Sequence, residues 1–169
     1  MSVLFGHRRL PITEVADPWD ALDVLEAHDA DPGFESRWRG FQRDCSLLLL
    51  PTLPPEAGAW VAVADEFEAG RLSVDGLTAA RVGAWQFHDA RRDTSPAVEL
   101  SGLRAVMYRL WPPDGRDWHE AAWYFLHFIG GAGLREDRWP LLRARFAAVL
   151  NGASEAEPRA AADRGLDSE

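Results

Sequence analysis

The clearest helical pattern in the sequence lies in residues 34–51, FESRWRGFQRDCSLLLLP. Its apolar side chains recur at steps of four, three, four and three residues: Phe34, Trp38, Phe41, Cys45 and Leu48. This spacing keeps them on one face of a helix with 3.6 residues per turn. Pro51 cannot continue such a helix, because proline has no backbone N–H to donate. The stretch therefore predicts a helix that buries one face in a core and ends near Pro51.

Comparable apolar stripes lie on both sides of this helix, separated by turns rich in proline and glycine. One precedes it, with Asp17 as N-cap, and the others are centred near Trp60, Leu77, Leu103 and Leu142. Residues 121–129 are apolar all round apart from His127, which is typical of a buried central helix. No stretch alternates with period two for long enough to demand a strand.

These patterns predict an all-α fold, a single-domain bundle of six or seven helices. We expect an irregular N-terminal arm in residues 1–16, a helical domain in residues 17–151, and a disordered acidic tail in residues 152–169. A chain of 169 residues is long enough to bury a core without a metal or a disulfide.

Composition excludes several classes of function. All 18 basic residues are arginine, so Schiff-base catalysis and a phosphate-binding loop with lysine are excluded. One cysteine excludes a disulfide scaffold and a zinc site with several cysteines. A formal net charge of −9 argues against direct binding of nucleic acid. No signal sequence or apolar span is evident, so we expect a cytoplasmic protein with no membrane contact.

Residues 41–90 contain a run, VAVADEFEAGRLS at 61–73, that is followed by Leu77, Ala80 and the pair Ala84–Trp85. This stretch resembles an Ala-rich segment of uncharacterised bacterial proteins, mainly from high-GC genomes. The resemblance implies a helical hairpin around Gly70 and no particular activity. A GC-rich coding source also accounts for the use of arginine in place of lysine.

Negative charge is concentrated near the N-terminus. Residues 1–70 carry 13 acids and 5 arginines, whereas residues 71–150 carry 9 acids and 11 arginines. Six acids recur at every third residue, Glu14, Asp17, Asp20, Asp23, Glu26 and Asp29. A helix that presents them could simply be a solvated face, or it could attract a basic partner.

The eight tryptophans divide into two groups by position. Six lie on or next to apolar stripes and are expected to be mainly core residues: Trp38, Trp60, Trp85, Trp111, Trp123 and Trp139. The other two, Trp19 and Trp118, lie at predicted helix starts. Because tryptophan is favoured in binding hot spots, we interpret Trp19 and Trp118 as interface candidates.

A metal site formed by histidines is the main alternative to the interaction site. His88, His119 and His127 could converge from different helices on a metal, as in helical-bundle metalloenzymes. The motif His119-Glu120 lacks the second histidine at the fourth following position, where Trp123 stands. The acids Asp65, Glu66 and Glu68 are too close in sequence to converge, so they predict a solvated face. Cys45 is expected to be inert packing.

We therefore expect a non-enzymatic protein-interaction module that needs no cofactor. Its basic protein partner would bind the acidic N-terminal helix through Asp17, Trp19, Asp20, Asp23, Glu26 and Trp118. An immunity protein that neutralises a basic toxin, or an adaptor subunit of an assembly, would have these features. The alternative is a metal- or cofactor-binding enzyme built on His88, His119 and His127.

Overall fold

The computed structural model of the chain describes residues 33–112, 118–134 and 139–150. These residues form six α-helices and two short 3₁₀ helices, with no strand among them. The elements are α2 (Phe34–Leu49), η2 (Leu50–Thr52), α3 (Glu56–Glu68), α4 (Val74–Arg91), α5 (Ala97–Met107), η3 (Tyr108–Leu110), α6 (Trp118–Gly131) and α8 (Trp139–Leu150). The prediction of an all-α bundle is confirmed. The predicted arm, the first predicted helix and the acidic tail lie outside the described residues.

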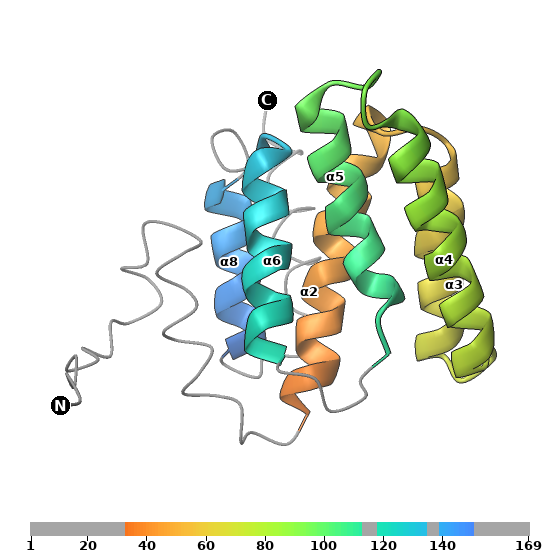
Figure 1. The fold of residues 1–169 in the computed structure, drawn as a ribbon. Helices are drawn as coiled ribbons and strands as arrows, with labels where there is room; N and C mark the ends of the chain where they lie inside the picture. Colours follow the sequence, from red (N-terminus) through yellow and green to blue (C-terminus); the bar gives the residue numbers. More distant parts are fainter. Residues whose placement is uncertain (1–32, 113–117, 135–138, 151–169) are drawn as a thin grey trace, which may run out of the picture.

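The helices stand roughly side by side in the bundle. Figure 1 shows α5 between α6 and α4, with α3 next to α4 and α8 next to α6. Helix α2 packs against α8, α5 and α3 and so crosses the back of the bundle. None of the helices in the described part is long and apolar enough to cross a membrane.

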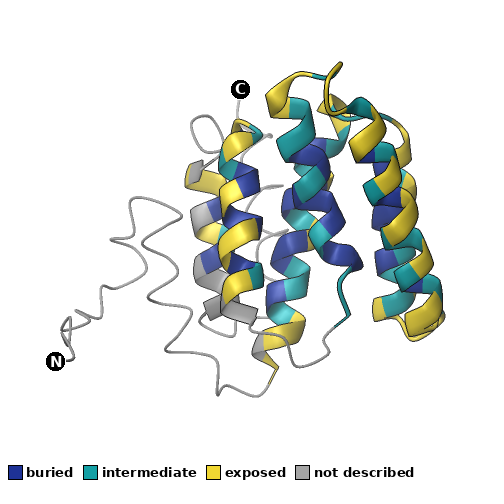
Figure 2. Ribbon diagram, in the orientation of Figure 1, coloured by how far each residue is buried: buried dark blue, intermediate teal, exposed yellow. Residues whose placement is uncertain are grey.

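The core consists of two apolar clusters. The larger one joins α2, α6 and α8 through a set of edge-on aromatic contacts between Trp38, Phe41, Phe125 and Phe146. The second joins α3, α4 and α5 around Leu77, Leu103 and Met107. Leu53 packs against both clusters and links them. Figure 2 shows the buried positions on the facing sides of the helices.

Helix α2 has the amphipathic pattern that the sequence predicts. Trp38, Phe41 and Cys45 are all buried, and the helix ends at Leu49 before the 3₁₀ turn that contains Pro51. The buried position in the last turn is Leu49, which is 2% exposed, whereas Leu48 is only partly buried. The difference of one residue arises because a period of 3.6 drifts away from strict steps of four and three.

Helices α3 and α4 form a hairpin with a glycine turn. Gly70 has φ of +71°, a left-handed conformation that glycine adopts without steric cost. Ser73 is the N-cap of α4, and its hydroxyl accepts a hydrogen bond from the Gly76 N–H at 3.2 Å. Two helices with a turn at Gly70 are what the sequence predicts here, while the resemblance to bacterial segments stays a prediction.

Helix α6 differs from its prediction as a helix buried all round. Ala122, Phe125, Leu126 and Ile129 are buried, but Trp123 is 42% exposed and Tyr124 is 37% exposed. His127 is also exposed. The apolar pattern counts tryptophan and tyrosine as apolar residues. Both, however, carry a polar N–H or O–H on an apolar ring and can therefore lie at the boundary between the core and water. The helix is therefore amphipathic, with an aromatic outer face.

Candidate functional site

A charged network lies at the contact between α2, α3 and η3. Arg109 of η3 has a fully buried side chain, and its Nη2 donates to Asp65 Oδ1 and to Glu68 Oε2, both at 2.8 Å. The two carboxylates lie one turn apart on α3 and are 30% and 22% exposed. A buried guanidinium needs such anionic partners, because burial of an unpaired charge is costly.

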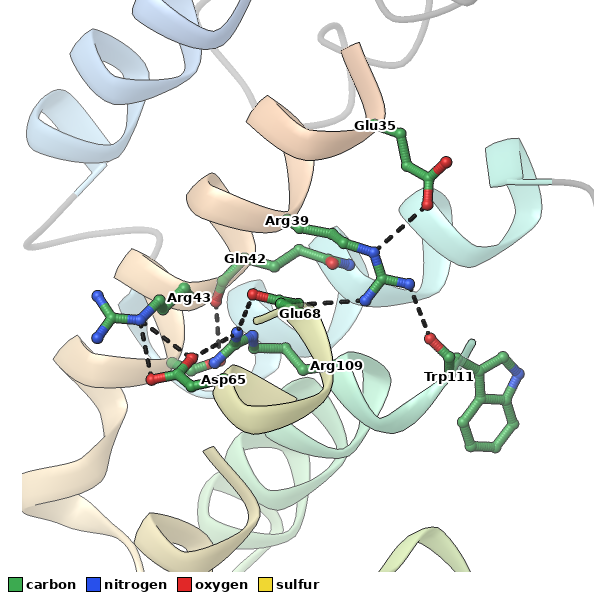
Figure 3. A network of polar contacts seen from close by, with 9 residues as sticks. Glu35, Arg39, Gln42, Arg43, Asp65, Glu68, Arg109 and Trp111 are labelled. Atoms are coloured by element: carbon green, nitrogen blue, oxygen red, sulfur yellow. Dashed lines mark hydrogen bonds and ion pairs between the residues drawn. The ribbon is translucent and has the colours of Figure 1, made fainter. Parts of the chain in front are cut away.

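Two arginines of α2 complete the network from the solvent side. Arg43 Nε contacts both carboxylate oxygens of Asp65 at 3.0 and 3.1 Å. Arg39 Nη1 lies 3.5 Å from Glu68, and its Nη2 donates to the Trp111 carbonyl oxygen at 3.0 Å. Figure 3 shows these groups together, with the Trp111 ring directed away from the charges.

This network corrects the prediction for the acids of α3. Asp65 and Glu68 do converge, because residues three apart lie on the same side of a helix. Only Glu66 behaves as a solvated charge, and its partner Arg71 lowers the pKa of its carboxyl. With three arginines against Glu35, Asp65 and Glu68, the charges of the network balance. The network therefore holds α2, α3 and η3 together and has a structural role.

A second polar feature is a surface of aromatic rings and arginines across α4, α5, η3 and α6. We call it the aromatic–arginine face, and define it by Arg81, Arg104, Tyr108, Trp111, Trp123 and Tyr124. The Tyr108 ring stacks at 5.9 Å on Trp111 and at 6.1 Å on Tyr124. Trp123 meets Tyr124 edge-on at 4.9 Å. The rings therefore form one continuous row from the end of η3 to the outer side of α6.

The two arginines of this face lie over aromatic rings. The Arg81 guanidinium carbon is 4.3 Å from the centre of the Trp111 ring, and that of Arg104 is 5.2 Å from Phe128. Such cation–π contacts stabilise the cation without neutralising it. Arg104 Nε also donates to His88 Nε2 at 3.2 Å, which makes His88 an acceptor at that nitrogen. Tryptophan, tyrosine and arginine are the side chains most enriched at binding hot spots.

The sequence-predicted partner site can be placed only in part. Asp17, Trp19, Asp20, Asp23 and Glu26 lie outside the described residues. Trp118 is the first residue of α6, but its side chain is likewise outside the described part. Sequence reasoning assigned Trp123 and Trp111 to the core and so missed the aromatic–arginine face. The polar atoms of Tyr124 and His127, three residues apart on one helix, are the signal that could have indicated it.

The structure places the histidines of the alternative site in different surroundings. His88 is 2% exposed and contacts Trp85, Asp89 and Arg104, whereas His127 stacks on Trp123 at the surface. The side chain of His119 lies outside the described part. Among the residues that the structure describes, no three histidine, cysteine or acidic side chains are grouped so that they could hold a metal ion.

Cys45 belongs to the core rather than to a site. Its side chain is fully buried, and this burial raises the pKa of the thiol well above its usual range. A thiol that stays protonated is a weak nucleophile. Comparisons with known proteins add no assignment, since no family model, no curated protein and no solved structure matches the chain.

Proposed function

We propose that the chain is a protein-interaction module that binds a basic protein partner through its acidic residues 17–31. One observation supports this proposal above the others: the bundle itself is close to neutral. Residues 33–150 hold 14 arginines and 15 acids, whereas residues 1–32 hold 2 arginines and 7 acids. Residues 151–169 hold 2 arginines and 5 acids, so the larger part of the excess negative charge belongs to the segment that precedes α2.

The carboxylates of the bundle are also largely committed to partners within it. Asp65 and Glu68 pair with Arg109, Glu66 pairs with Arg71, and Glu99 pairs with Arg91. Paired carboxylates contribute little to the long-range field, because their charge is compensated nearby. The acids at every third residue from Asp17 onward are the ones whose charge a basic partner would meet first. An immunity protein or an adaptor subunit would use such a segment.

Binding of the full chain to a basic partner tests the proposal. Tagged protein captures partners from the source cell at low and at high salt, and the affinity for each recovered protein is then measured with purified components. Asp20→Ser with Asp23→Ser and Glu26→Ser should weaken the binding of a salt-sensitive partner by about tenfold, since three exposed charges at about 0.5 kcal/mol each contribute about 1.5 kcal/mol.

A matched variant separates the segment from net charge. Glu56→Ser with Asp75→Ser and Asp93→Ser removes three exposed acids of the bundle, none of which forms an ion pair among the described residues. This control should retain the affinity of the native chain. Equal loss in the two triple variants, or binding that high salt leaves unchanged, would contradict the proposal, because a Debye length of about 3 Å at 1 M salt screens exposed charges.

A further inference from the structure

Arg81 and Arg104 are the uncompensated charges of the aromatic–arginine face. Within the described residues, neither guanidinium has a carboxylate at ion-pair distance, whereas five other arginines each have one: Arg39, Arg43, Arg71, Arg91 and Arg109. Both are only partly buried, and both lie against rings of the face. The face therefore offers two positive charges together with the exposed rings of Trp123 and Tyr124.

We propose that residues 17–31 of the same chain dock on the aromatic–arginine face. The inference rests on the proposed function in one respect: it concerns the segment that would bind the basic partner and adds how that segment is regulated. In the isolated chain, the acids of the segment pair with Arg81 and Arg104. A basic partner then has to displace the segment before it can bind.

The chain enters α2 close to this face. Gly33 is the N-cap of α2 and has φ of +86°, a left-handed conformation that commonly ends a preceding helix and turns the chain. Arg39 lies six residues further on, about 9 Å along the helix axis, and its Nη2 contacts the Trp111 carbonyl oxygen. The segment before Gly33 therefore ends less than two helical turns from the residue that contacts the backbone of Trp111.

The size of the segment matches the face. Fifteen residues of helix are about 22 Å long, and the distance across three adjacent helices is about 16–20 Å. Figure 1 shows α4, α5 and α6 in one row, so the face extends over this width. A helix of this length that lies next to the N-terminal end of α2 can therefore cross the whole face.

The chemistry of the segment is complementary as well. Residues 17–31 carry six acids and no arginine, and the apolar residues Trp19, Leu22 and Leu25 recur among them. Acids at every third residue can reach Arg81 and Arg104 while these apolar residues cover Trp123 and Tyr124. Opposite charges next to apolar contact are the combination that gives an interface both orientation and affinity.

Docking lowers the apparent affinity for a partner. If the segment is released in only one tenth of the molecules, for example, the apparent dissociation constant rises about tenfold, because only the released fraction binds. Both the basic partner and the aromatic–arginine face compete for the same carboxylates. The segment therefore acts as an internal competitor that sets a threshold concentration for the partner.

The absence of lysine makes a direct test possible. Arg81→Lys introduces the only side-chain amine of the full chain, and carbodiimide couples an amine to any carboxylate that it touches. Trypsin then releases residues 10–37 as one peptide, because no arginine lies between Arg9 and Arg37. We expect this peptide to be coupled to position 81 in protein of monomer mass, with fragmentation locating the bond within residues 17–31.

Two variants of the same kind serve as controls. Arg71→Lys should couple to Glu66, since Arg71 Nε already lies 2.7 Å from a Glu66 oxygen. Arg92→Lys places its amine about 16 Å further along α4 from position 81 and should give no product with residues 17–31. Arg104→Lys repeats the test at the second arginine, in case the change at position 81 disturbs the contact with Trp111.

The outcomes separate the possible occupants of the face. Coupling between two chains means that a second copy occupies the face, and it overturns the inference. The inference is also overturned if the amine couples to Glu35 alone. It is overturned as well if neither position 81 nor position 104 gives a coupled product while Arg71→Lys reacts. The coupling experiment contains no partner, so its result is independent of the pull-down. Residues 17–31 can dock on the face even if no basic partner exists, and they can bind a basic partner even if they do not dock.

Discussion

Arg109 and Asp65 lie 44 residues apart in the sequence, and Arg109 Nη2 donates a hydrogen bond to Asp65 Oδ1 at 2.8 Å. The contact is asymmetric in its burial. The guanidinium has no exposed surface, whereas the carboxylate is 30% exposed and is also held by Arg43. The cation therefore depends on its anions more than the anions depend on the cation.

This asymmetry predicts which substitution costs more stability. Asp65→Asn with Glu68→Gln leaves a buried guanidinium without counter-charge and should lower the unfolding free energy by about 3–5 kcal/mol. Arg109→Met removes the buried charge together with its Nε and Nη1, which have no partner among the described residues. It should cost about 1–3 kcal/mol. Urea unfolding measures both, and a larger loss for Arg109→Met would refute the asymmetry.

Two glycines in helices should respond to alanine in opposite ways. A Cβ at Gly102 of α5 would come within 2.7 Å of Leu53 Cδ2, and Leu53 packs against both core clusters. Gly102→Ala should therefore lower the unfolding free energy by about 1–2 kcal/mol. At Gly83 of α4 a Cβ meets nothing within 4 Å, so Gly83→Ala should raise it by about 0.5–1 kcal/mol. Denaturant unfolding of the two variants checks the difference in sign.

Glu99 gives a prediction for pH. Hydrogen bonds from Ser95 and then Arg91 lower the pKa of its carboxyl below the ordinary value. A lowered pKa in the folded state means that the stabilisation is complete above the unfolded pKa of about 4.3 and is lost as pH falls through the folded pKa. Glu99→Gln should thus be less stable than the native chain at neutral pH, by up to about 1 kcal/mol. The two unfolding curves should converge in acid, and a gap that widens in acid would contradict the prediction.

Cys45 should report on unfolding of the bundle. Because its thiol is fully buried and its pKa is raised by that burial, a thiol reagent should leave the native protein unmodified at mildly alkaline pH. Complete modification should follow in guanidinium chloride. Labelling of the native chain at the rate of an exposed cysteine would show that α2 opens without unfolding of the whole bundle.

The sequence allows the helices to be predicted well, because their signals are local. The stripe of Trp38, Phe41 and Cys45 identifies a buried face, and Gly70 and Ser73 mark a turn by their own conformations and hydrogen bonds. Pairing between distant residues has no such local signal. Arg109 stands next to Leu110 in an apolar stretch, and nothing near it in the sequence indicates Asp65 as its partner.

The prediction for the outer face of α6 is wrong for a different reason. Periodicity assigns Trp123 to the core because its ring is apolar, but a residue's side of a helix depends on which neighbours the helix packs against. Helix α6 packs against α5, and Phe125 and Leu126 take the buried positions of the cluster shared with α2 and α8. Trp123 and Tyr124 are then left on the outside.

Helix α6 allows this distinction between core and surface aromatics to be tested within three residues. Phe125 is fully buried and contacts Trp38 and Phe41, so Phe125→Ala should cost about 3–5 kcal/mol of unfolding free energy. Trp123→Ala should cost no more than about 1 kcal/mol, because 42% of Trp123 is exposed. Docking of residues 17–31 does not change this expectation, since a segment that can leave the face without unfolding the bundle adds little to the global free energy. Equal costs in urea unfolding would mean that the outer face of α6 is part of the core.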